Sequence, residues 1–136
     1  RPFFIRINSY FLICGALFCA LSFFGGHFAF TRFYGDKYQL DHYLAFALVS
    51  LGYLRFLYTI PSSFIGVLGS TVYLKRYSSL NMAFFAVSIL LFAGLIYNQF
   101  DPTKSVILAS LTNWLLRVVY GYRLAYANIA NKIDNG

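Results

Sequence analysis

The run "LNMAFFAVSILLFAGLIY", from Leu80 to Tyr97, is eighteen residues long and contains no charged side chain. A helix of about 20 mostly apolar residues crosses the hydrocarbon core of a bilayer. Inside lipid the backbone N–H and C=O groups must pair within the segment, which favours a helix. The chain as a whole is 60% hydrophobic and 11% charged, whereas soluble domains carry about 25% charged residues. We therefore predict an integral membrane protein.

Three more apolar stretches have the length of a membrane span. Together with the first run they predict four transmembrane helices, over about residues 3–25, 52–74, 80–98 and 105–126. The chain shows no internal repeat. We expect one membrane domain over residues 1–136, of the all-α class and folded as a four-transmembrane-helix bundle.

The second apolar stretch permits two interpretations. It extends from Tyr43 to Tyr73, which is long for one crossing and short for two, and it contains Arg55 and Pro61. We interpret it as an interfacial lead-in followed by a single crossing from about Gly52, kinked at Pro61. The alternative is a break at "TIPSS" that gives two half-crossings.

The segment between the first two spans, "GGHFAFTRFYGDKYQLDHY", mixes glycine, aromatic side chains and charge. Aromatic side chains are enriched where the membrane meets water, so we expect an aromatic-rich interfacial loop here. His27 and His42 flank this loop and are the only histidines, which makes them weak candidates for metal or haem ligands. We predict neither a metal nor another cofactor, and leave a bound phospholipid open.

Basic residues outnumber acidic ones, with eleven Lys and Arg against four Asp and no Glu, for a net charge of +7. They are scattered between apolar spans and form no basic stripe, so we predict no nucleic-acid partner. With four spans, one side of the membrane holds Arg1, Arg6, Lys75, Arg76 and Lys132, and the other holds Arg32, Lys37 and Lys104. The excess predicts that both termini face the cytoplasm or the matrix, in a bacterial or mitochondrial inner membrane.

Arg117 lies about twelve residues into the fourth predicted span, where a charge costs at least a few kcal/mol. The four carboxylates all fall outside the predicted spans; they belong to Asp36, Asp41, Asp101 and Asp134. Four partners stay open for the guanidinium: a lipid phosphate, the amides of Asn113 and Asn81 or backbone carbonyls, an acidic residue of another chain, or an anionic ligand. The candidate partner- or ligand-binding residues are Arg117, Asn113, Arg55 and Arg123.

Small and polar residues recur every four positions on two predicted spans. One row comprises Ser105, Ala109, Asn113, Arg117, Gly121 and Ala125, and the other comprises Ser62, Gly66 and Ser70. Small residues at this spacing let helices approach closely in lipid. The predicted helix-packing residues, inside the bundle or at an interface with another subunit, are Ser62, Gly66, Ser70, Ala109 and Gly121.

The sequence contains no Gly-x-Ser-x-Gly motif, no His-Glu-x-x-His motif and no phosphate-binding glycine loop. Ion-coupled transporters use intramembrane acids, which the predicted spans lack. A catalytic role is therefore not favoured. We expect a non-catalytic subunit, or an assembly or stabilising component, of a larger membrane complex or homo-oligomer. The alternative is binding or translocation of a lipid or anionic amphiphile, with Arg117 contacting its headgroup. The expected partners are membrane lipids and other membrane subunits or copies of this chain.

Overall fold

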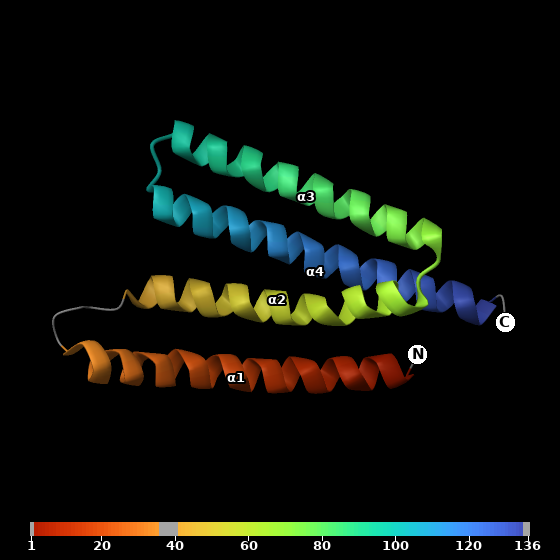
Figure 1. The fold of residues 1–136 in the computed structure, drawn as a ribbon, viewed down its shortest axis with the longest axis horizontal. Helices are drawn as coiled ribbons and strands as arrows, with labels where there is room; N and C mark the ends of the chain where they lie inside the picture. Colours follow the sequence, from red (N-terminus) through yellow and green to blue (C-terminus); the bar gives the residue numbers. More distant parts are fainter. Residues whose placement is uncertain (1, 36–40, 135–136) are drawn as a thin grey trace.

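The computed structural model describes residues 2–35 and 41–134, which form four α-helices and no strand (Figure 1). These helices are α1 (Pro2–Tyr34), α2 (His42–Leu68), α3 (Thr71–Tyr97) and α4 (Pro102–Asp134). Of the described helices, α1, α2 up to Val67, and α3 are long and apolar enough to cross a membrane. The all-helical class is confirmed, and these three apolar helices indicate a membrane location. The fourth helix is as long as α1, but it is not apolar enough to count as a candidate membrane span.

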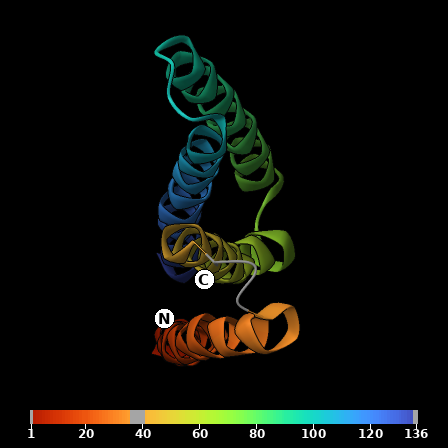
Figure 2. The same ribbon diagram turned by 90° about the vertical axis from the view of Figure 1, so that its left-hand side faces the viewer.

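The helices lie side by side in a row, in the order α1, α2, α4, α3, so the last helix of the chain is inserted between α2 and α3. The α2 and α4 helices run in the same direction, and α1 and α3 run in the opposite one (Figure 1). Figure 2 shows the row from one end, with α1 and α3 at its two edges. A row leaves two broad faces uncovered, and most of the large apolar side chains are accordingly exposed.

The predicted aromatic-rich loop between the first two helices is largely helical, so the prediction of a loop over these residues is wrong for most of the segment. The double glycine of this segment does not interrupt α1, which continues to Tyr34 and ends at Gly35, where φ is 64°. Each glycine costs a helix only about 1 kcal/mol, whereas a backbone group left unpaired in apolar surroundings costs more. The second helix begins at His42. Residues 36–40 of the predicted loop lie outside the described residues.

The second predicted span, 52–74, includes a helix end. The structure ends α2 at Leu68 and begins α3 at Thr71, with a two-residue connection between them. Glycine is required at position 69 of this connection, because a Cβ there would lie 2.2 Å from the carbonyl oxygen of Ile65. The N–H of Gly69 donates to that same oxygen at 2.9 Å, which completes the last turn of α2.

The second helix is continuous through Pro61, so the alternative of a break at "TIPSS" is not seen. Proline has no N–H to pair with the carbonyl four residues earlier, which is that of Leu57. The Tyr122 hydroxyl of α4 shares its single proton between this carbonyl, at 3.4 Å, and Oδ1 of Asn8 on α1. Gly121 faces the proline ring, since a Cβ on it would lie 3.3 Å from Pro61 Cγ. The fourth helix thus provides both the space and a hydrogen bond that accommodate the proline in α2.

Buried apolar side chains gather at the end of the row where α2 stops and α3 starts. The cluster comprises Phe4, Ile60, Ile65, Leu124 and Ala125, with Tyr73 and Tyr77 of α3 packed against it. Phe4 is only 2% exposed, and its ring meets Phe64 edge-on at 4.5 Å and Tyr126 at 5.1 Å between ring centroids. The neighbouring Phe3 is 70% exposed. Phe4 therefore packs α1 against both α2 and α4.

Replacing Phe4 by alanine is expected to destabilise the folded chain. A core Phe→Ala change costs about 3–5 kcal/mol in soluble proteins, and because lipid is as apolar as the core, we expect about half of that cost here. The matched change Phe3→Ala removes the same ring from an exposed site and should alter stability by less than about 0.5 kcal/mol. Thermal unfolding of both variants in one detergent, followed by circular dichroism, measures the difference. Equal stability of the two variants would contradict this role of Phe4.

Candidate functional site

The guanidiniums of two arginines lie close to the ring of Trp114 on α4. The guanidinium carbon (Cζ) of Arg55, on α2, is 5.2 Å from the centroid of the Trp114 ring, and that of Arg117, one turn further along α4, is also 5.2 Å away. A cation held over an aromatic face gains about 0.5–2 kcal/mol, but its charge is not neutralised. We call these three residues the cationic centre.

Arg117 meets two neutral acceptors of its own chain. Its Nε donates to Oδ1 of Asn113, one turn earlier on α4, at 3.2 Å. Its Nη2 donates to the backbone carbonyl of Asn81 on α3 at 3.4 Å. Amide and backbone oxygens, one of the four kinds of partner considered from the sequence, are therefore present. A guanidinium has five N–H donors, so the remaining donors of Arg117 have no hydrogen-bond partner among the described residues.

Polar and aromatic side chains of α2 and α3 surround the cationic centre. Nδ2 of Asn81 donates to Tyr58 Oη at 2.8 Å, and the Tyr58 ring meets Trp114 edge-on with centroids 5.5 Å apart. Tyr77 stacks on Tyr58 at 5.9 Å, and its buried hydroxyl has no hydrogen-bond partner in the described part of the chain. Three helices thus contribute polar groups to one place in an otherwise apolar row.

The described carboxylates are engaged elsewhere. The Asp41 carboxylate accepts a hydrogen bond from the N–H of Tyr43 at 3.0 Å, and that of Asp101 accepts one from the N–H of Thr103 at 3.2 Å. Both acids therefore stabilise helix N-termini, those of α2 and α4. No ion pair forms between described side chains, so the two guanidiniums of the cationic centre lack a negative partner within this part of the chain.

The cationic centre lies halfway along its helices. Arg55 is the middle residue of α2, thirteen residues from either end, which is about 20 Å at 1.5 Å per residue. Arg117 is fifteen residues from the start of α4 and seventeen from its end. The second helix is apolar enough to cross a membrane. If it does, Arg55 lies near the middle of the hydrocarbon core, the place where a charge costs most.

The other predicted ligand-binding residues lie away from this centre. Arg123 is exposed, and its side chain makes no hydrogen bond to a described residue. The antiparallel arrangement of α1 and α2 brings the rings of His27 and His42 together, with centroids 5.0 Å apart. Over the described ranges, no group of three or more His, Cys, Asp or Glu is placed to hold a metal ion. The two histidines are neighbours without a third ligand.

The predicted helix-packing residues divide between the inside and the outside of the row. Ala109 and Gly121, on α4, are buried. On α2, Ser62 is partly buried and Gly66 is exposed, and Ser70, in the connection between α2 and α3, is also exposed. A Cβ on Gly66 would meet nothing within 4 Å. The small residues of α4 therefore serve packing inside the molecule, and those at the end of α2 do not.

Sequence reasoning did not include Trp114, Tyr58 or Tyr77 in the site. The spacing in the sequence could have indicated part of the site, because Arg55 and Tyr58 are three residues apart, and so are Trp114 and Arg117. Residues three apart lie on one face of a helix. The pattern does not show that these two faces meet, because α2 and α4 are neither consecutive nor antiparallel.

Comparison with protein-family models, with curated proteins and with solved structures found no match for this chain. The class of protein is therefore described from the structure: an all-helical protein, with three helices able to cross a membrane and a cationic centre between α2, α3 and α4.

The close approach of α2 and α4 at Gly121 predicts the effect of a larger side chain. Gly121→Val would place methyl groups against Pro61 and push the helices apart, with a cost of about 1–3 kcal/mol. Gly66→Val is the matched control, because it makes the same change on a helix position with open space beside it. We expect Gly121→Val to lower the thermal midpoint by several degrees and to shift Trp114 fluorescence, and Gly66→Val to do neither. A larger effect of Gly66→Val would argue against this contact.

Proposed function

We propose that this chain is a small polytopic membrane protein that acts as a non-catalytic subunit or assembly component of a larger membrane complex. The observation that carries the proposal is the cationic centre, with two guanidiniums at mid-helix and no carboxylate among the described residues to meet them. A charge held in apolar surroundings without a counter-charge is expensive. A negative group supplied from outside the chain would offset that cost, which gives the chain a reason to assemble.

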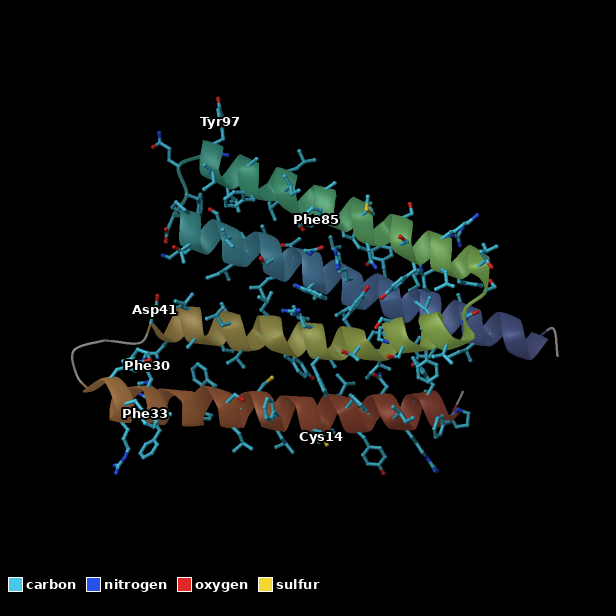
Figure 3. The ribbon with its side chains drawn as sticks, in the orientation of Figure 1. Cys14, Phe30, Phe33, Asp41, Phe85 and Tyr97 are labelled. Atoms are coloured by element: carbon cyan, nitrogen blue, oxygen red, sulfur yellow. The ribbon has the colours of Figure 1, made fainter. Side chains whose placement is uncertain are left out.

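The arrangement of the helices supports the same proposal. The helices at the two edges, α1 and α3, each have a neighbour on one side only. Large apolar side chains cover their free sides, and Figure 3 shows Phe33 and Tyr97 pointing away from the row at opposite edges. Both are more than 80% exposed. Such a row offers its neighbours a wide apolar surface for contacts between subunits or with lipid.

We further propose that α4 crosses the membrane with the other three helices. It lies between α2 and α3, both of which are apolar enough to cross. Its polar side chains at Asn113 and Arg117 are hydrogen-bonded to one another and to α3, which lowers the cost of placing them in lipid.

Four crossings would place both ends of the chain on the same side, as in Figure 1. Arg6, Lys75 and Arg76 belong to that end of the row, and Arg32 and Lys104 belong to the other. The end with both termini carries more of these basic residues, and the positive-inside rule places such an end in the cytoplasm or the matrix. The proposed orientation therefore has both termini on that side of a bacterial or mitochondrial inner membrane.

The single tryptophan offers a direct measurement of depth. Because Trp114 lies beside Arg55 at the middle of α2, a crossing α2 and α4 would hold it near the bilayer centre. In vesicles of lipids brominated along the acyl chain, bromines near the chain ends should quench its fluorescence more than bromines close to the headgroup. The opposite order would place α4 at the membrane surface and contradict the four-span arrangement.

The assembly role is tested in native membranes. The tagged full-length chain, extracted in mild detergent, should migrate on native gels as a particle larger than the 15.5 kDa chain and its detergent. Chemical crosslinking before extraction should join it to at least one other membrane protein or to further copies of itself. A monodisperse monomer that crosslinks to nothing would contradict the proposal.

A second candidate function, binding of an anionic amphiphile, is favoured by a different observation. An apolar groove of about 620 Å³ lies between α1 and α2, lined by residues that include Gly15, Phe18, Gly52 and Phe56. A groove of this character suits an acyl chain. Its weakness is that lipid phosphates lie at the membrane surfaces, whereas Arg55 and Arg117 lie at mid-helix.

A further inference from the structure

We infer that the cationic centre is the docking site for a transmembrane helix of a different protein, one that carries an Asp or Glu near the middle of its span. This inference rests on the proposed assembly role and adds the place, the chemistry and the kind of partner. Four observations lead to it: the unused donors, the aromatic support of the two arginines, their position halfway along the helices, and the positions of this chain's own acids.

The arginines have hydrogen-bonding capacity that this chain leaves unused. Arg55 is exposed, and its guanidinium lies over Trp114 without a hydrogen bond or ion pair to a described residue. Arg117 uses Nε and Nη2 on neutral oxygens and keeps its remaining N–H groups. A carboxylate is the group that a guanidinium binds best, through two parallel hydrogen bonds. Both side chains can therefore accept a carboxylate without losing a stronger partner.

The centre holds its charges in place before a partner arrives. Trp114 supports both guanidiniums, Tyr58 fixes the ring of Trp114, and Asn81 holds Tyr58 through a 2.8 Å hydrogen bond. Side chains that are already ordered lose less entropy on binding. Two cations close to the same ring make the positive potential around it stronger than one cation would, and that potential attracts an anion.

The depth of the centre selects the kind of anion. Arg55 is about 20 Å from each end of α2 at 1.5 Å per residue. Lipid phosphates lie outside a hydrocarbon core of about 30 Å, so they approach the ends of α2 and not its middle. An acidic side chain on a neighbouring transmembrane helix can lie at any depth, because its position along that helix determines the depth. An intramembrane carboxylate therefore fits the centre better than a headgroup.

A second copy of this chain does not supply that carboxylate. Asp41 precedes α2, Asp101 precedes α4, and both cap helix N-termini. Asp134 is the last residue of α4, and Asp36 lies between α1 and α2 in the sequence. A neighbouring copy in the same bilayer would carry Asp41, Asp101 and Asp134 near its helix ends, far from Arg55 of the first copy. The acid must come from a different chain.

The experiment compares variants of the full-length tagged chain in native membranes by quantitative recovery of the partner. The double change Arg55→Gln with Arg117→Gln removes both charges, and Arg123→Gln removes one charge outside the centre. Asn113→Asp introduces a carboxylate where Arg117 already donates at 3.2 Å, so it should satisfy Arg117 within the chain. Asn113→Leu removes the same acceptor without adding charge. Thermal unfolding and Trp114 emission report whether each variant is folded.

We expect at least tenfold less partner from the double variant and from Asn113→Asp, recovery within twofold of wild type from Arg123→Gln, and more partner from Asn113→Leu than from Asn113→Asp. The recovered protein must contain an Asp or Glu within a transmembrane span, and changing that residue to Asn or Gln must reduce recovery equally. If the double variant does not fold, Asn113→Asp decides, because it adds an ion pair and removes no charge of the centre.

The remaining outcomes overturn the inference. A complex that survives both the double change and Asn113→Asp would leave the assembly role standing but place the contact elsewhere. A partner without an intramembrane acid, or a particle made only of this chain, would do the same. Loss of a retained anionic phospholipid, with the complex unchanged, would make lipid the occupant. No complex from the wild-type chain would remove the assembly role and this inference together.

Discussion

The close contact between α2 and α4 at Pro61 and Gly121 determines the rest of the structure. The two helices are parallel, so one fixed contact sets their register over many turns. Arg55 lies six residues before Pro61, and Trp114 lies seven residues before Gly121. Two turns away from the fixed contact, the register therefore places Arg55 over Trp114. A side chain larger than glycine at 121 would separate the helices and would remove the geometric basis of the cationic centre.

Polar contacts link helices of the row, including pairs that are not adjacent in it, and they matter in a membrane because hydrophobic burial contributes little there. Lipid is as apolar as leucine, so helices in it are held by close packing and by hydrogen bonds. Tyr122 of α4 joins Asn8 of α1 and Leu57 of α2, and Asn81 of α3 joins Tyr58 of α2. These bonds, each worth about 0.6 kcal/mol in measured membrane proteins, connect residues that are more than twenty positions apart in the sequence.

Several features of the sequence predicted the structure because they act locally. Long apolar runs required helices, and the spacing of Asn113 and Arg117 placed them on one face of α4, where they bond. The end of α2 at Leu68 was missed, since the reason for it is a backbone contact at Gly69 that hydropathy does not reveal. The extension of α1 was missed because glycines and aromatic side chains were read as a loop. The partnership of Arg55 with Trp114 depends on a parallel pairing of nonconsecutive helices, which no local pattern contains.

On the proposed assembly role, the neutral partners of Arg117 bear on the order in which the chain inserts and binds its partner. A chain that inserts alone must hold two guanidiniums in apolar surroundings before any counter-charge is present. The aromatic face of Trp114, the amide of Asn113 and the carbonyl of Asn81 supply partial compensation at that stage. They carry no charge of their own, so they do not compete strongly with a carboxylate that arrives later. An internal aspartate at 113 would stabilise the lone chain further and would remove its reason to bind. On the proposed role, asparagine at this position lets the chain fold first and still leaves the centre positive for its partner.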